Sequence, residues 1–388
     1  MKINLVGAVG GGNFGDEFIL NCCIAEHIKN KDAKVSVSGF SPDIILKSGF
    51  SVENHSLNFF NILDKLRQKA ENGLKISMND LISQFEGAEE FDAIHFIGGG
   101  YINSLWPSNY ALLGIAYIYS KIHKKPIHAT GLGLYPYEEN ESLTSLFNSL
   151  DIIDVRDEKS KSLIPSASFT GDDALLALNE PSMLVKNDDS PALILSLQSH
   201  LFEGQSLIEK IFTDGTFKEL KNKKIKKIII IEAAPEDNIP FSRETFNNTL
   251  ANGIEIEFVT GNEILRRGIP FNSRSFVISS RYHINLIYSM LNVSGIAVYQ
   301  NEYYRNKHKS VTEMGGAWSI LNHDKLSEAL DHWLPLDSEN YTSPNNMINK
   351  AKEKKELFNK IIANAQNKDK KSISLESALA VINKFITK

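Results

Sequence analysis

The chain of 388 residues carries 42 lysines and arginines against 47 aspartates and glutamates, a formal net charge of −5. With 42% hydrophobic and 23% charged residues it has the composition of a globular protein, which excludes a largely disordered or fibrous chain. Single cores usually split beyond ~250–300 residues, so the length favours two domains. The mild acidic excess argues against nucleic-acid binding, which needs a basic surface.

Short β-branched runs alternate with amphipathic segments from the start of the chain. In the first half we predict strands at 3–8, 34–38, 93–97, 127–130 and 152–155, and helices at 17–28, 110–122 and 141–150. In the second half we predict strands at 193–197, 228–232, 255–259, 276–279 and 296–299, and helices at 205–220, 243–251, 262–267 and 284–291. This alternation is typical of an α/β protein with parallel sheets covered by helices on both faces.

A turn-rich stretch at 179–191 divides these elements into two halves. We therefore predict a Rossmann-like domain at 1–180, a second one at 191–335, and a helical tail at 336–388 that packs back on the domains. Ligands of such sheets bind beyond the carboxyl ends of the strands. A cleft between the halves is the site that this arrangement predicts.

The tail holds eight lysines between residues 350 and 371. The simpler interpretation is a solvated helix face, and the alternative is a basic strip that contacts anionic lipid headgroups. Apolar residues at helical spacing between 373 and 386 predict a helix that docks on a domain.

The remaining composition indicates a cytoplasmic protein. The only cysteines, Cys22 and Cys23, are adjacent and cannot link distant segments, which is typical of a reducing compartment. We find neither a signal-peptide apolar region nor a membrane-length apolar run. The histidines show no ligand spacing, so we predict no metal site and no cofactor.

A glycine-rich loop follows the first predicted strand. Gly10, Gly12 and Gly15 satisfy G-x-G-x-x-G, a pattern that lets the backbone approach a ligand closely. Asp16 and Glu17 then open the helix, where their charges oppose a pyrophosphate, and no acidic residue ends the second strand to hold a ribose. The loop thus suits sugar hydroxyls better than a dinucleotide, with the carboxylates as acceptors or general base. The alternative is that Asp16 only caps the helix.

Two further strand exits are rich in glycine, at 98–100 and 131–133. Close approach of a ligand and a tight turn without a ligand both explain such an exit. The acceptor-binding residues that we predict are Gly11, Gly12, Asn13, Asp16, Gly99, Gly100 and Tyr101.

Basic residues close a strand in each half. Arg156 follows one strand, and Arg281 and His283 follow another and open a helix, where a strand end, a helix N-terminus and a cation would together hold an anion. Two such arginines facing one cleft would bind a small dianion. The alternatives are a salt bridge for each arginine, with Asp157 or Asp173, and a polar core position for His283.

In order, these blocks resemble the polysaccharide pyruvyl transferases over about residues 3–310. The matching blocks are G-x-x-G-x-x-N-x-G-D-E from Gly7 to Glu17, the triplet at 98–100, V-R-D at 155–157, a G-D-P-A-like block at 171–174 with Asp173 in place of proline, and R-L-H at 281–283 with Tyr282 in place of leucine. A Y-x-x-K-like stretch follows, and its equivalents among Tyr299, Tyr303, Tyr304, Lys307 and Lys309 stay open.

The resemblance implies a GT-B-like fold and transfer of pyruvate from phosphoenolpyruvate to two hydroxyls of one sugar, giving a cyclic ketal and phosphate. It implies that Arg156, Arg281 and His283 bind the donor. We expect His283 to act as the acid and Asp16 or Glu17 as the base. The acceptor would be a cell-surface polysaccharide or its lipid-linked precursor. Peripheral contact of the protein with the inner face of the membrane stays open, and so does the formation of a homo-oligomer. The alternatives are a GT-B-type glycosyltransferase or epimerase acting on a nucleotide sugar, and a glycan-binding protein without activity.

Overall fold

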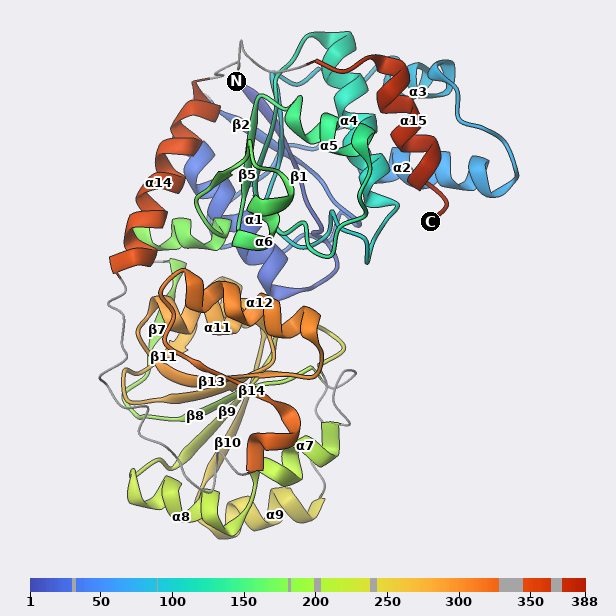
Figure 1. Cartoon of the computed structure of the whole chain (residues 1–388). Helices are drawn as coiled ribbons and strands as arrows, with labels where there is room; N and C mark the ends of the chain where they lie inside the picture. The colour runs from blue at the N-terminus through green and yellow to red at the C-terminus, as the bar shows by residue number, and fades with distance from the viewer. Residues whose placement is uncertain are drawn as a thin grey trace. The chain divides into compact units, whose positions relative to one another are not determined.

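The computed structural model describes residues 1–29, 33–88, 90–180, 183–198, 204–237, 243–327, 345–363 and 372–388 (Figure 1). The chain divides into two compact units. The first comprises Met1–Gly11, Asp16–Leu176 and Lys350–Lys388, and the second comprises Gly12–Gly15 and Ala177–Asn349.

The first unit is built on a six-stranded parallel sheet with helices in its connections. The strand order is β2 (Lys34–Ser38), β1 (Lys2–Val6), β3 (Ala93–Phe96), β4 (Ile127–Leu132), β5 (Ile152–Val155) and β6 (Ser168–Phe169). The connections hold α1 (Phe14–Ile28), α2 (Phe59–Glu71), α3 (Met78–Phe85), α4 (Asn109–His123), α5 (Glu141–Asn148) and α6 (Glu158–Leu163), and a 3-10 helix, η1 (Asp173–Asn179), follows β6. The order reverses between β1 and β3, so the topological switch point, where ligands of such sheets bind, lies at their carboxyl ends.

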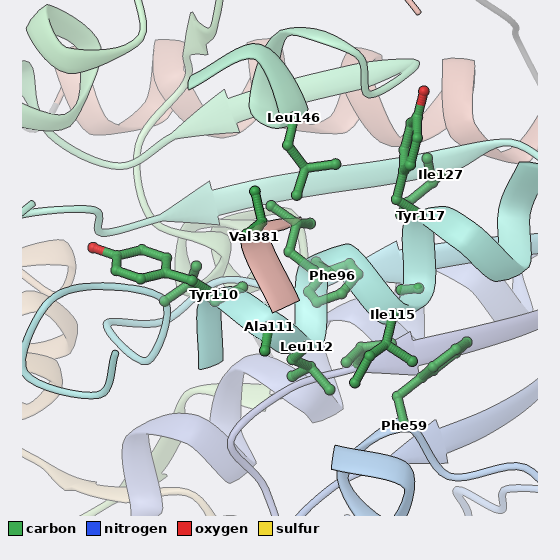
Figure 2. Packing of buried hydrophobic residues seen from close by; sticks show 14 of the residues in the cluster. Phe59, Phe96, Tyr110, Ala111, Leu112, Ile115, Tyr117, Ile127, Leu146 and Val381 are labelled. Carbon is green, nitrogen blue, oxygen red and sulfur yellow. The ribbon is translucent and has the colours of Figure 1, made fainter. Parts of the chain in front are cut away.

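The core of the first unit surrounds α4, whose residues Asn109–Ser120 are all buried. A helix that is apolar all round needs cover on both sides. One side faces the sheet, and the C-terminal helix α15 (Leu375–Phe385) packs on it with Val381 directed towards α4 (Figure 2). Gly114 permits this close approach, because a Cβ there would lie 2.8 Å from Ile382 Cγ1. The predicted docking of the 373–386 helix is confirmed.

The second unit repeats the architecture with a different strand order. Its sheet runs β10 (Glu255–Thr260), β9 (Lys227–Glu232), β8 (Leu193–Ser196), β12 (Phe276–Ser279), β13 (Ser294–Tyr299) and β14 (Ser319–Asn322), and β11 (Ile269–Phe271) pairs with β7 (Val185–Asn187). The helices are α7 (Gly204–Ile211), α8 (Asp214–Asn222), α9 (Arg243–Ala251), α10 (Gly261–Arg267), α11 (Tyr282–Met290) and α12 (Glu302–Glu313), with the 3-10 helix η3 (His323–Lys325). Counted from β8, this is the doubly wound order 3-2-1-4-5-6, with its switch point between β8 and β12.

The two parallel sheets confirm the predicted α/β class with two Rossmann-like domains. Strands β2, β5 and β12 and helix α9 have the predicted bounds. The single helix predicted at 205–220 is wrong, because Thr213 begins a new helix by accepting a hydrogen bond from the Thr216 amide. Helices α2, α3, α6 and α12 were not predicted.

The tail forms α14 (Asn345–Ile362) and α15, while the predicted domain boundary at 335/336 lies outside the described residues. The solvated-face interpretation of the lysines is wrong for Lys354, whose side chain is fully buried. Across the described ranges, no helix has the length and apolar character needed to cross a membrane.

Candidate active site

The buried side chain of Glu17 fixes the glycine loop after β1 through hydrogen bonds with backbone amides. Its Oε1 accepts a hydrogen bond from the Gly10 amide at 2.7 Å and its Oε2 accepts one from the Ile45 amide at 3.1 Å. Gly10 has φ +85°, and a Cβ there would lie 2.3 Å from the Ser41 carbonyl oxygen. Because Glu17 is fully buried and both of its oxygens bind backbone amides, it shapes the loop, and the base assignment passes to Asp16 alone.

Asp16 is partly exposed and faces the next strand exit. Its Oδ1 lies 3.5 Å from where a Cβ on Gly99 would stand, and Gly99 has φ +142°. Gly11 is exposed, with no atom within 4 Å of its Cβ position, and Gly100 is partly exposed. The structure thus brings the loop after β1 and the triplet after β3 together at the switch point of the first unit.

Tyr101 differs from its predicted role. Its side chain is buried, and its hydroxyl lies 2.8 Å from the Val6 carbonyl and 3.1 Å from the Ile97 carbonyl. The tyrosine therefore supports the glycine triplet from inside the unit, and we correct its assignment as an acceptor contact.

Arg156, at the end of β5, is also buried in the first unit. Its guanidinium lies against the Gly133 backbone, where a Cβ would be 2.4 Å from Nε. It forms ion pairs of 3.6 Å each with Asp157 and Asp172. The salt bridge with Asp157, which was the alternative to an anion-binding role, is therefore present, and Asp172 is an additional partner.

Residues 12–15 belong to the second unit, where they meet the end of β9 and the start of α11. The Phe14 amide donates to the Ala233 carbonyl at 2.7 Å, and Pro235 lies 3.1 Å from the Cβ position of Gly12. At Gly15 a Cβ would lie only 1.8 Å from Nδ1 of His283. The glycine loop and the Arg-Tyr-His block, far apart in the sequence, are thus in direct contact through Gly15 and His283.

Arg281 is oriented by two carboxylates that sequence reasoning missed. Its Nε donates to Asp237 Oδ2 at 2.8 Å, and its Nη2 bonds both the other oxygen of Asp237 and Glu236 Oε1. Burial raises the pKa of Asp237, and the guanidinium acts against this rise. Among the described residues these hydrogen bonds use Nε and Nη2 of Arg281 but not Nη1.

Helix α12 adds an aromatic and cationic group beside Arg281. Lys307 Nζ lies 5.0 to 6.0 Å from the ring centroids of Tyr303, Tyr304 and Tyr282. Burial raises the pKa of Tyr304, against the opposing effects of a hydrogen bond with Gln198 and the charge of Arg281, so its hydroxyl keeps its proton. Tyr304 and Lys307 are spaced as Y-x-x-K, which was the available signal for them in the sequence.

No group of three metal-ligating side chains capable of holding an ion occurs in the part of the chain that the structure describes. The first unit presents the Asp16 carboxylate beside Gly99 at its switch point. Separately, the second unit presents Arg281, Tyr304 and Lys307 near the start of α11. Both cysteines are free and buried on α1, where burial raises the pKa of each thiol and disfavours the reactive thiolate.

Two Rossmann-like units of this topology define a protein of the GT-B fold. In agreement, S. aureus MnaA, solved with UDP, has a TM-score of 0.53 at 14% identity, with 96% of this chain and 99% of that chain covered. A putative UDP-N-acetylglucosamine 2-epimerase from Listeria monocytogenes has a TM-score of 0.49 at 14% identity, with 90% of both chains covered. A family model for polysaccharide pyruvyl transferase matches residues 13–266. The chain belongs to the polysaccharide pyruvyl transferase family. No curated protein matches its sequence.

Proposed function

We propose that this protein transfers pyruvate from phosphoenolpyruvate to two hydroxyls of one sugar unit, in a cell-surface polysaccharide or its lipid-linked precursor. The product is a cyclic ketal, and phosphate is released. The observation that carries the proposal is the contact of Gly15 with His283. It joins the two most specific sequence blocks of the family, and it places an ionisable ring beside the residue that precedes Asp16.

The second unit supplies most of the donor site in this proposal. Phosphoenolpyruvate is a small polyanion, and the start of α11 offers backbone amides together with Arg281 and His283. In this proposal Arg281 donates to the ligand through Nη1, while Asp237 fixes the orientation of its guanidinium group. Lys307 adds a positive charge, and Tyr304 adds a hydroxyl donor. Arg156, held in place by its ion pairs, remains the proposed donor contact from the first unit.

The first unit supplies the acceptor site. Asp16 accepts a hydrogen bond from a sugar hydroxyl and acts as general base, because it is the partly exposed carboxylate at the start of α1, directly after the glycine loop. Gly11, Gly99 and Gly100 are the other acceptor contacts that this proposal takes from the first unit, whereas Gly12 and Asn13 belong to the second unit. Glycine at these positions lets a sugar ring lie directly against the backbone.

The reaction needs one proton donor and one proton acceptor. His283 protonates the methylene carbon of phosphoenolpyruvate, and positive charge develops on the central carbon. Asp16 takes the proton of the first hydroxyl as its oxygen attacks that carbon. Phosphate leaves with the electron pair of the broken C–O bond, and the second hydroxyl closes the ring. One of the two hydroxyl protons replaces the proton that His283 gives to the methylene carbon, and the other protonates the released phosphate.

Phosphate release from phosphoenolpyruvate tests the proposal when candidate oligosaccharide and lipid-linked acceptors are supplied. We expect acceptor-dependent phosphate release by the natural protein and loss of at least about 100-fold in His283→Ala, the lower range for general acid catalysis. His123→Ala is the matched control, because His123 ends α4 of the first unit just before the amino end of β4, away from the carboxyl strand ends where the proposed site residues lie. Near-normal turnover by His283→Ala would remove the acid assignment.

The nucleotide-sugar alternative is supported only by the likeness in fold to MnaA. It predicts thermal stabilisation by UDP and none by phosphoenolpyruvate, since a ligand stabilises the folded state that binds it. Our proposal predicts the reverse. A catalytically inactive glycan-binding protein would be stabilised by the sugar but release no phosphate.

A further inference from the structure

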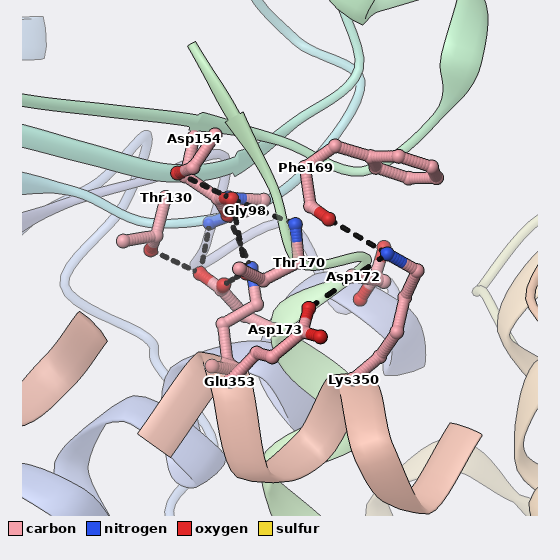
Figure 3. A network of polar contacts seen from close by, with 12 residues as sticks. Gly98, Thr130, Asp154, Phe169, Thr170, Asp172, Asp173, Lys350 and Glu353 are labelled. Carbon is pink, nitrogen blue, oxygen red and sulfur yellow. Dashed lines mark hydrogen bonds and ion pairs between the residues drawn. The ribbon is translucent and has the colours of Figure 1, made fainter. Parts of the chain in front are cut away.

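A fully buried lysine from the C-terminal helix lies at the strand ends of the first unit. Lys354, on α14, is 0% exposed, and its Nζ lies 2.5 Å from Asp154 Oδ2 and 2.8 Å from Asp173 Oδ1. Both carboxylates are also fully buried. Figure 3 shows Asp154 and Asp173 gathered beside α14 with Gly98 and Thr130. Burying three charges costs free energy, so such a cluster persists only where its hydrogen bonds are well satisfied.

The two carboxylates are bonded to the glycine-rich strand exits. Asp173 Oδ2 accepts from the Gly98 amide at 2.8 Å and from the Thr130 hydroxyl at 2.6 Å. Asp154 Oδ2 accepts from the Gly131 amide at 3.0 Å. Gly98 follows β3 and Gly131 lies near the carboxyl end of β4, so a single carboxylate links the ammonium of Lys354 to the backbone at each of these strand ends.

The network has no room for side chains at these glycines. A Cβ on Gly98 would lie 3.1 Å from Asp173 Oδ2, and one on Gly131, which has φ +57°, would lie 2.7 Å from Asp173 Oδ1. The Asp173 carboxylate therefore explains in part why glycine occupies positions 98 and 131. The hydrogen bonds from these two glycine amides to Asp173 and Asp154 also fix the backbone at the two strand ends.

Lys354 remains charged in this environment. Burial acts to lower its pKa, but Asp154 and Asp173 outweigh burial and raise it. Burial raises the pKa of Asp173, and Lys354 and Thr130 act against that rise. The positive charge of the Lys354 ammonium thus offsets the repulsion between the two buried carboxylates of the cluster.

We infer that Lys354 is a positioning residue for the acceptor site: through Asp173 and Asp154 it holds the glycine exits after β3 and β4 in the geometry that receives the sugar. The inference rests on the proposed function. Gly99, which faces Asp16, directly follows Gly98 in the chain, so a shift of the Gly98 amide moves an acceptor contact.

Lys354→Met tests the inference, because it keeps most of the side chain and removes the ammonium. The double variant Lys354→Met/Asp173→Asn removes one charge of each sign and keeps an amide oxygen for Gly98. Because the net charge of the buried cluster is then unchanged, we expect the double variant to be more stable than the single variant. Lys355→Met is the matched control, since Lys355 is the exposed neighbour on the same helix.

Two readouts separate positioning from stability alone. In steady-state kinetics, we expect the KM for the acceptor to rise about tenfold or more in the single and double variants, with a smaller change in the KM for phosphoenolpyruvate, and Lys355→Met to match the natural protein. In amide hydrogen exchange, we expect faster exchange in peptides containing Gly98 and Gly131 in both variants. Unchanged acceptor KM with unchanged exchange in the folded double variant overturns the inference.

The exchange measurement does not depend on the reaction. If the natural protein releases no phosphate from phosphoenolpyruvate, the proposed function fails, yet faster exchange in the variants still shows that Lys354 holds the loops. If the natural protein is active and the folded variants exchange faster without any change in acceptor KM, the loops are held but do not position the sugar, and the inference fails alone.

Discussion

Replacing Gly15 with alanine tests the contact on which the proposed function rests. The new Cβ would stand 1.8 Å from His283 Nδ1, whereas an ordinary contact begins at about 3.4 Å. The ring must therefore move by about 1.6 Å, because Gly15 is at the start of α1 and the loop before it is fixed by hydrogen bonds. A 1 Å misplacement of a catalytic group costs about 100-fold in rate, so we expect kcat/KM for phosphate release to fall by at least that factor. Overpacking should also cost about 1–3 kcal/mol of folding stability.

A double-mutant cycle shows whether the effect passes through His283. In a His283→Ala background the ring is absent, so Gly15→Ala should cost little further stability, and we expect a coupling free energy of about 1 kcal/mol or more. Denaturant unfolding of the four proteins measures it, alongside phosphate release. An equal loss of stability from Gly15→Ala in both backgrounds would refute the contact, as would undiminished activity of the single variant.

Three further predictions concern the donor site and the core. Asp237→Asn weakens the fork that orients Arg281, and we expect a rise of about tenfold in the KM for phosphoenolpyruvate, corresponding to about 1.4 kcal/mol; an unchanged KM would contradict the orienting role. Phe385→Ala removes a fully buried ring 4.9 Å from that of Tyr110, and we expect a loss of about 3–5 kcal/mol in chemical denaturation; a loss below about 1 kcal/mol would mean that α15 docks weakly. Burial lowers the pKa of His27 from 6.5 to about 3, so below pH 6.5 the unfolded chain binds a proton that the folded protein does not. Stability should then fall by up to about 1.4 kcal/mol per pH unit as the pH drops from 6.5 towards 3, and His27→Gln should reduce this slope, measured by urea unfolding across that range; identical slopes would exclude His27 as a source.

Most of the sheet strands were predictable from the sequence because parallel strands buried on both faces read as continuous apolar runs. The 228–231 run of four isoleucines is an example, and β9 contains it. Helices α2 and α3 were missed because no strand-like run or glycine motif directs attention to the segment between β2 and β3. Its helix starts are nevertheless encoded, in the caps Asn58 and Ser77.

The candidate site was predictable where function is written as a motif and not where it depends on tertiary contacts. Gly15 and His283 were both singled out, but only the fold shows that they touch. Asp237 carries no motif, and its pairing with Arg281 arises because β9 and β12 end at the same edge of one sheet. Glu17 looked like a second catalytic carboxylate because sequence does not reveal which side of a loop a side chain occupies.

Lys354 had a signal that is visible in retrospect. It falls in the series Met347, Ala351, Lys354, Phe358 and Ile361, whose spacing is that of one helix face, and all five side chains are buried. A lysine in line with four apolar residues differs from its exposed neighbours. Its partners could not have been found in the same way, because they are distant in the sequence. Asp154 precedes Lys354 by 200 residues, and the segment Ala177–Asn349 of the second unit separates both aspartates from the lysine in the chain.

The most direct test of the central claim is phosphate release from phosphoenolpyruvate by the purified 388-residue chain, measured with and without a panel of oligosaccharide and lipid-linked acceptors. We predict release that requires an acceptor, with one pyruvate joined to the sugar as a ketal for each phosphate formed, and loss of both products in His283→Ala. Phosphate release that is independent of the acceptor, or stabilisation by UDP with no turnover of phosphoenolpyruvate, would contradict the account.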